Sequence, residues 1–196
     1  MRQKMKRLIG ILLSLAMVLG LMPGMSLTAL AYDGNPYASL VGTTTSVTFN
    51  GKPWYIIADN STAVDAGTVT LLAADTSFGT SKFHDSSNAY SSSTVNSMLV
   101  ALTAEGGAFA SVKDAIVNTN LTDVGVTGAK LYLLSTSEAQ QLSSNVLKMN
   151  FSSMMGVWWL RSPGYVDYDA AFVDGEHGDV DGSGATSERS SASVPL

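Results

Sequence analysis

One run of seven residues, Trp158 to Gly164, restricts the fold of this chain more than any other part of the sequence. It reads Trp-Trp-Leu-Arg-Ser-Pro-Gly. Its first four residues have the apolar character of a short strand, and Ser162-Pro163-Gly164 ends it. Because adjacent strand residues point to opposite faces, Trp158 and Trp159 should lie on opposite sides of a sheet. We expect one of them in the core and the other as a wall beneath the following loop.

Arg161 is the single charged residue in this otherwise apolar run. A buried guanidinium needs partners, since an unpaired buried charge is strongly unfavourable. We therefore predict that Arg161 pairs with a carboxylate or with backbone carbonyls and fixes the direction in which the next loop leaves the strand. Trp158, Trp159 and Arg161 together form a predicted structural platform.

The sequence changes character after Gly164 and becomes acidic and rich in Gly and Ser. Ala171 and Val173 alternate with Phe172 and Asp174, and Val180 alternates with two aspartates. This pattern predicts two short strands, each with one apolar face, joined by a turn at residues 175–178. Phe172 is then expected on the outward face among the acids.

Exposed aromatic rings interleaved with short polar residues are typical of recognition surfaces, because they offer a large contact area at low entropic cost. The alternative is that these rings pack beneath neighbouring loops. The candidate ligand-binding residues are Tyr165, Val166, Asp167, Tyr168, Asp169, Phe172, Asp174, His177, Asp179 and Asp181.

The remainder of the chain predicts an α+β domain with antiparallel strands at both ends and two helices between them. Asn50-Gly51, between two β-rich runs, is a strong hairpin signal. Ser93 is placed to cap one helix, and Ser135 with Glu138 forms a capping box that opens another. The expected elements are a hairpin at 47–58, strands at 68–74 and 131–134, helices at 94–103 and 136–142, a helical turn or two at 109–117, a loop at 118–128 and irregular chain at 145–156.

The first 31 residues have the features of a secretory signal peptide. A basic stretch precedes an apolar run, Ile11 to Met22, which is too short to span a membrane. Ala29-Leu30-Ala31 supplies small residues at a cleavage site. We expect export to the cell surface or medium without membrane insertion after cleavage, a lead-in segment at 32–46 and one domain at 47–196.

Charge and cysteine content exclude several classes of function. Four of the 11 basic residues and none of the 16 acidic residues lie in the leader, so the mature chain would carry a net charge of −9. This balance argues against nucleic acid as a partner, because phosphate backbones are bound through basic patches. The chain has no cysteine, which excludes disulfides, thiolate metal sites and cysteine nucleophiles. No cofactor is expected.

Catalysis and calcium binding are weaker alternatives. The chain has two histidines, His84 and His177, and lacks the Gly-x-Ser-x-Gly motif of many serine hydrolases. A cell-envelope hydrolase would have to use His177 with nearby carboxylates. Residues 177–188 partly match a calcium loop, with Asp179, Asp181 and Glu188 on ligand positions and His177 in place of the first aspartate. A looser calcium site could use Asp167, Asp169 and Asp174.

Several of these motifs together resemble those of an uncharacterised exported domain family of gut Firmicutes. The resemblance rests on Phe49-Asn50-Gly51-x-x-Trp54, the helix start at 93–99, Leu131 to Glu138, and above all WWLRSPG followed by Ala170-Ala171-x-Val173. It covers residues 47–196, although the ending at 193–196 matches the family's closing VRPAL run only loosely. The resemblance implies a C-type-lectin-like fold, similar to that of variable proteins of diversity-generating retroelements.

This resemblance does not extend to catalysis, because the related formylglycine-generating enzymes depend on cysteines that this chain lacks. The calcium-dependent sugar motifs of animal lectins are absent too. Retroelement diversification rewrites adenines, so Asn codons give a restricted set of residues. Every residue from Tyr165 to Ser187 except Glu176 belongs to that set. The chain has nine asparagines from Asn35 to Asn150 and none after Asn150. An ordinary Gly/Ser-rich acidic loop has an overlapping composition.

The leading hypothesis is a secreted or surface-associated protein that binds a protein or glycan ligand through residues 165–183, without catalysis. Its surface would be a diversified one, with small or apolar framework residues pointing inward and variable side chains pointing outward. The hydrolase and a structural surface module without a ligand are the rival hypotheses.

Overall fold

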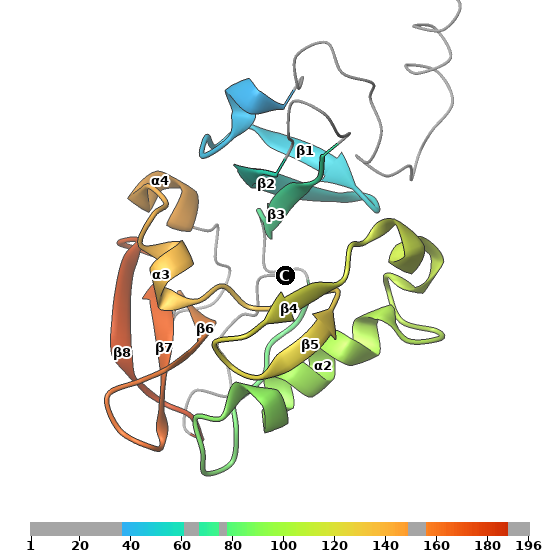
Figure 1. The fold of residues 1–196 in the computed structure, drawn as a ribbon. Helices are drawn as coiled ribbons and strands as arrows, with labels where there is room; N and C mark the ends of the chain where they lie inside the picture. Colours follow the sequence, from blue (N-terminus) through green and yellow to red (C-terminus); the bar gives the residue numbers. More distant parts are fainter. Residues whose placement is uncertain (1–36, 61–66, 75–77, 149–155, 188–196) are drawn as a thin grey trace, which may run out of the picture.

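The computed structural model of the chain describes residues 37–60, 67–74, 78–148 and 156–187. The predicted leader, residues 32–36 of the lead-in segment, Glu188 and the closing residues 193–196 lie outside these ranges. The described part is α+β, as predicted, with three small antiparallel sheets and short helices (Figure 1). One sheet comes from the N-terminal part of the chain and another from the C-terminal part, with the helices between them in sequence.

The N-terminal sheet has the order β1-β2-β3, with strands β1 (Ser46–Phe49), β2 (Lys52–Asp59) and β3 (Val69–Ala73). A short 3-10 helix, η1 (Ala38–Leu40), precedes it. The predicted turn between β1 and β2 is confirmed, and Asn50 and Gly51 both have positive φ angles, 50° and 72°. Two successive positive φ angles are what a two-residue hairpin turn requires, and Asn-Gly tolerates them best.

Helix α2 (Thr94–Thr103) matches the predicted range, and the Ser93 side chain accepts a hydrogen bond from the Asn96 backbone N–H. The capping box at Ser135 and Glu138 is also confirmed. It opens only a single turn, α3 (Thr136–Ala139), which ends before the predicted Leu142. The other helices are η2 (Tyr90–Ser92), η3 (Ala110–Ala115) and α4 (Ser144–Leu147).

Three predictions in the middle of the chain are wrong. The predicted irregular chain at 145–156 begins with residues of helix α4, which covers Ser144–Leu147. The predicted loop at 118–128 contains a hairpin, β4 (Thr119–Leu121) and β5 (Val126–Ala129). Residues 131–134, predicted as a strand, belong to none of the three sheets. Leu133 and Leu134 are buried as expected, so the apolar run correctly predicted burial but not strand pairing.

The C-terminal sheet has the order β6-β7-β8, with strands β6 (Val157–Pro163), β7 (Asp169–Asp174) and β8 (Asp179–Ala185). All three predicted strands and the turn at 175–178 are confirmed. Two irregularities shape this sheet. The pairing of β6 with β7 is interrupted between Trp159 and Pro163, and β8 carries a bulge opposite the step from Ala170 to Phe172.

Both faces of strands β6 and β7 are buried. Trp159, Ala170 and Phe172 belong to a core cluster that includes the apolar face of α2, whereas Trp158, Ala171 and Val173 belong to a second cluster with α3 and α4. The two tryptophans therefore lie on opposite faces, as predicted, but both are fully buried core residues. Their indole N–H groups donate to the backbone carbonyls of Leu147 and Ser81, respectively.

The prediction that Phe172 points outward is wrong, because only 6% of this residue is exposed. The alternation of Phe172 with Ala171 and Val173 predicts one solvated face. A central strand covered on both sides is instead apolar on both faces. Among the described residues, no helix is long and apolar enough to cross a membrane.

Candidate functional site

The structure divides the predicted ligand-binding residues between two ends of the C-terminal sheet (Figure 1). Residues 164–168 connect β6 to β7 at one end, and residues 175–178 connect β7 to β8 at the other. Five residue steps separate Asp169 from Asp174, or about 16 Å at the usual rise of a strand. We call residues 164–168 the β6–β7 loop and residues 174–179 the β7–β8 turn.

The β6–β7 loop presents apolar and aromatic side chains to solvent. Tyr165 is 77% exposed, Tyr168 62% and Val166 41%. They are three of only five large hydrophobic residues exposed in the described part of the chain, the others being Val100 and Val117. Asp167 is exposed between them, and Asp169 is half-buried. Three exposed apolar residues among four consecutive positions form a compact patch of the kind that marks interaction sites.

The backbone of this loop is held firmly although its side chains are free. The Tyr165 N–H donates to the Gly182 carbonyl at 2.8 Å, and the Asp169 N–H donates to the Val166 carbonyl at 2.9 Å, which closes a β-turn. The Thr186 N–H donates to the Tyr168 carbonyl at 2.9 Å. A loop fixed by its own backbone keeps its side chains in place without requiring them for folding.

Asn88, which the sequence analysis did not select, supplies further anchors. Its backbone N–H donates to the Asp167 carbonyl and its side-chain amide to the Val166 carbonyl, both at 3.0 Å. The partners are 78 or more residues apart in sequence, so no local pattern could have identified the contact. The long polar segment before α2 therefore buttresses the candidate surface.

The bulge in β8 brings Gly182 against the β6–β7 loop. A Cβ atom added at Gly182 would lie 3.1 Å from the Tyr165 ring, so the ring rests on the bare glycine backbone. Gly164 is packed as closely from the other side, because a Cβ atom there would overlap the Gly182 carbonyl oxygen. The two glycines thus allow the loop to approach the edge strand β8 closely. The bulge in β8 contributes, because bulges commonly change the direction in which a strand presents its residues.

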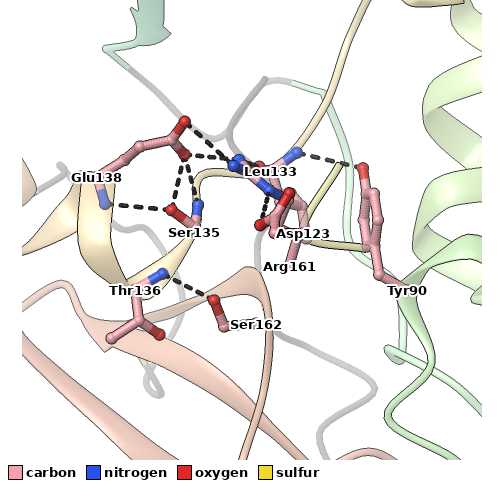
Figure 2. Close-up of polar contacts among 8 residues, drawn as sticks. All are labelled: Tyr90, Asp123, Leu133, Ser135, Thr136, Glu138, Arg161 and Ser162. Carbon is pink, nitrogen blue, oxygen red and sulfur yellow. Dashed lines mark hydrogen bonds and ion pairs between the residues drawn. The ribbon is translucent and has the colours of Figure 1, made fainter. Parts of the chain in front are cut away.

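The predicted pairing of Arg161 with carboxylates and carbonyls is confirmed (Figure 2). Its side chain is only 6% exposed. Two of its nitrogens contact the Glu138 carboxylate at 2.6 and 3.1 Å, Nε donates to Asp123 at 2.8 Å, and Nη1 also donates to the Leu133 carbonyl at 2.8 Å. Burial alone would lower the pKa of Arg161, but the hydrogen bonds to Glu138 and Asp123 outweigh it and raise this pKa.

Glu138 has two functions in this network. One oxygen accepts from the Ser135 backbone N–H at 2.7 Å and also from Arg161, which links the cap of α3 to strand β6. Ser162 strengthens the same link by accepting from the Thr136 N–H at 2.9 Å. These contacts occur where β6 leaves β7, so the network holds the strand that leads into the β6–β7 loop.

Two tyrosines complete the surroundings of Arg161. Burial raises the pKa of Tyr90 to about 12, and its hydroxyl accepts from the Leu133 N–H at 3.3 Å. The Arg161 guanidinium lies 5.7 Å from the ring centre of Tyr132. All groups around Arg161 are thus engaged with one another, which is the arrangement of a structural ion-pair network.

The β7–β8 turn holds the one histidine–carboxylate pair among the described residues. His177 Nδ1 lies 2.8 Å from Asp174 Oδ2, and the histidine side chain is 63% exposed. The hydrogen bond to Asp174 raises the pKa of His177, and the hydrogen bond to His177 lowers the pKa of Asp174. Within the described chain, neither histidine ring is hydrogen-bonded to a serine hydroxyl. The pair thus lacks the geometry of a hydrolytic triad here.

Neither calcium alternative is supported by the described residues. Asp179 and Asp181 lie on strand β8 and not in a loop, and Glu188 is outside the described ranges. Asp174 is at the opposite end of β7 from Asp167 and Asp169. No group of three or more metal-binding side chains gathers anywhere in the described part.

Comparison of this chain with models of protein families, with curated proteins and with solved structures finds no match in any of the three. The function of the site therefore rests on its own geometry.

Proposed function

We propose that this protein is an exported binding module that recognises a macromolecular ligand through the β6–β7 loop, with no catalysis of its own. The single observation that carries the proposal is the combination of exposed side chains and a fixed backbone at residues 165–168. Pre-organised aromatic contacts bind with little entropic cost, because neither the backbone nor the ring torsions need much further ordering.

The proposed surface is narrower than the range 165–183. It consists of Tyr165, Val166, Asp167 and Tyr168, flanked by Asp169 and by Asp181, whose carboxylate accepts from the Ser183 N–H. Phe172 is excluded by its burial. Asp174, His177 and Asp179 lie at the other end of the sheet, so a ligand seated on the tyrosines would not need them.

The C-type-lectin-like fold and the relation to retroelement variable proteins are part of the same proposal. Antiparallel sheets from both ends of the chain, with helices between them, support the fold assignment. The outward side chains at 165–168 support diversification of this loop, whereas buried Phe172 would belong to the framework. A near-copy of the codons for 165–190 that differs at adenines, beside a reverse-transcriptase gene, is the genomic observation that tests diversification.

The direct test compares the chain with a Tyr165→Ser/Tyr168→Ser variant on arrays of glycans and of bacterial and host surface proteins. We expect at least one saturable interaction that the variant loses while its melting temperature stays within about 2 °C of the parent, because exposed surface substitutions change stability little. Val100→Ser is the matched control, since Val100 is 61% exposed on α2, away from the loop. It should bind like the parent.

Three outcomes would contradict the proposal. A double variant that binds as well as the parent would show that the tyrosines are not used. A large loss of stability would show that they belong to the core. Hydrolysis of an envelope glycan or peptide that His177→Ala abolishes would favour the hydrolase, since that substitution removes the only ring paired with a carboxylate in the described chain.

A further inference from the structure

A pocket of about 330 Å³ lies among residues that the proposed function does not use. It is bounded by the edge strand β3, by the residues that link η3 to β4, and by residues 130–134. Its volume falls at the lower end of the range for small-molecule sites. Most of the wall is apolar, and the main contributors are Val69, Leu71, Ile116, Val117, Leu131 and Tyr132.

Among the described residues that line this pocket, Lys130 is the one with a charged side chain. Its ammonium donates to the backbone carbonyls of Lys113 and Ile116, both at 2.7 Å, and so is held in place at the end of η3. An ammonium has three N–H donors, so one remains after these two bonds. None of the ion pairs formed by the described residues involves Lys130. A fixed cation without a carboxylate partner thus borders an apolar space.

The neutral polar groups of the wall are engaged with one another. The Asn60 side-chain amide donates to the Thr70 hydroxyl at 3.1 Å, and Tyr132 is hydrogen-bonded to Thr119. Burial raises the pKa of Tyr132 even though the bond to Thr119 opposes this shift, so its phenol is uncharged at neutral pH. None of the described lining side chains would repel an anion, and among them the attraction comes from Lys130.

We propose that this pocket binds a small organic monocarboxylate with an apolar body, which places its carboxylate on Lys130 and its hydrocarbon part against Leu71, Ile116 and Val117. A phosphate or sulfate ester fits less well, because such groups are usually held by several cations or by a row of backbone N–H groups. An amine would meet the Lys130 charge. The pocket is independent of the proposed function at the β6–β7 loop.

The test uses the purified chain and one matched pair of probes, 3-phenylpropionate and the neutral 3-phenylpropanamide. Trp54 lines the pocket, so its fluorescence and calorimetry both report binding. We expect saturable binding of the acid that is at least about tenfold tighter than that of the amide, as one charge-assisted hydrogen bond would give. Amide shifts in NMR spectra should place the probe at Val69, Ile116 and Lys130.

Variants separate the charge from the cavity. Lys130→Met should reduce the affinity for the acid to that for the amide, whereas Lys130→Arg should retain the preference for the acid. Val69→Trp fills the space and should block both probes, and Lys82→Met, a lysine outside the pocket, should change nothing. Absence of saturable binding up to about 10 mM would overturn the proposal, because even a weak site of this size should then be occupied. Equal affinity of the unmodified chain for the acid and the amide would also overturn the proposal. This outcome does not depend on whether any variant folds.

Discussion

The β6–β7 loop and strand β7 are consecutive in the sequence and similar in composition, yet the structure uses them in opposite ways. Tyr165 and Tyr168 are largely exposed, while Phe172, four residues later, is 6% exposed and packs with Trp159. The loop is attached through its backbone and the strand through its side chains. Residue type therefore does not distinguish an exposed ring from a core ring here, whereas the burial of its surroundings does.

The largest expected effect contrasts the two regions directly. Phe172→Ala should destabilise the fold by about 3–5 kcal/mol, because it removes a buried aromatic ring and leaves a cavity in the core cluster that contains Trp159. Tyr168→Ala should cost no more than about 0.5 kcal/mol, since most of that ring is already in solvent. Urea unfolding followed by tryptophan fluorescence measures both. Similar values for the two variants would remove the distinction between loop and strand.

The next effect concerns the support of the strand that leads into the loop. Arg161→Met should cost about 2 kcal/mol, less than for a fully buried pair, because Asp123 and Glu138 are each more than 40% exposed and regain water. The same denaturation experiment measures it. Lys82→Met, which breaks the exposed pair with Asp85, is the control and should be near neutral. An Arg161→Met variant as stable as the control would mean that the network does not support β6.

Two glycines on β8 extend the comparison between loop and strand, because Gly184 faces the core and Gly182 faces the exposed Tyr165 ring. A Cβ atom at Gly184 would lie 2.6 Å from the Trp159 ring and 2.7 Å from the Ala170 carbonyl oxygen, so Gly184→Ala should cost about 1–3 kcal/mol by overpacking. The same change at Gly182 meets only the exposed Tyr165 ring, which can move, and should cost about 0.5 kcal/mol. Thermal unfolding of both variants tests this. The reverse order would mean that the Tyr165 ring is held as tightly as the core.

The smallest effect is expected at the β7–β8 turn. The His177 pKa is raised, so its contribution to stability is complete below the unfolded value of about 6.5 and is lost as the pH rises through the higher folded value. The Asp174 pKa is lowered, so its contribution is present above about 3.9 and is lost as the pH falls through the lower folded value. The pair therefore stabilises the fold most between about pH 4 and 6.5.

An NMR titration of the His177 ring tests this assignment. Its midpoint should fall when Asp174 is replaced by Asn and should stay unchanged in Asp167→Asn, which alters a carboxylate at the opposite end of β7. A midpoint that does not respond to Asp174→Asn would show that the two side chains do not interact in solution.

The sequence predicted elements well where the signal is local. Asn50-Gly51 defined a turn, Ser93 defined the start of α2, and the capping box defined the start of α3. It also predicted that Arg161 pairs with carboxylates, because desolvation of a charge permits little else. Asp123 and Glu138 as the partners could not be predicted, since they are 38 and 23 residues away.

The error at Phe172 arises because an alternating pattern separates a buried face from a solvated one only when one face of the strand is exposed to solvent. The alternation with apolar neighbours predicts that Phe172 faces solvent, but its side chain packs in the core cluster that contains Trp159 and Ala170. The hairpin β4–β5 was missed because its strands are three and four residues long, too short for a period of two to show. The candidate residues are divided between two ends of the sheet because strand β7, six residues long, separates the β6–β7 loop from the β7–β8 turn.

The attachment of the β6–β7 loop limits which residues it can accept. Every hydrogen bond that the described contacts give residues 165–168 uses a backbone N–H or carbonyl of the loop, and these groups do not depend on the side chain. The side chains at residues 165–168 can therefore change in size, charge and polarity while the backbone of the loop keeps its conformation. Proline is the exception at Tyr165, where the N–H that bonds Gly182 would be lost. The side chains at these four adjacent positions can therefore be exchanged without a compensating change in the core. Under the proposed function, such exchanges would give the loop new ligand specificities.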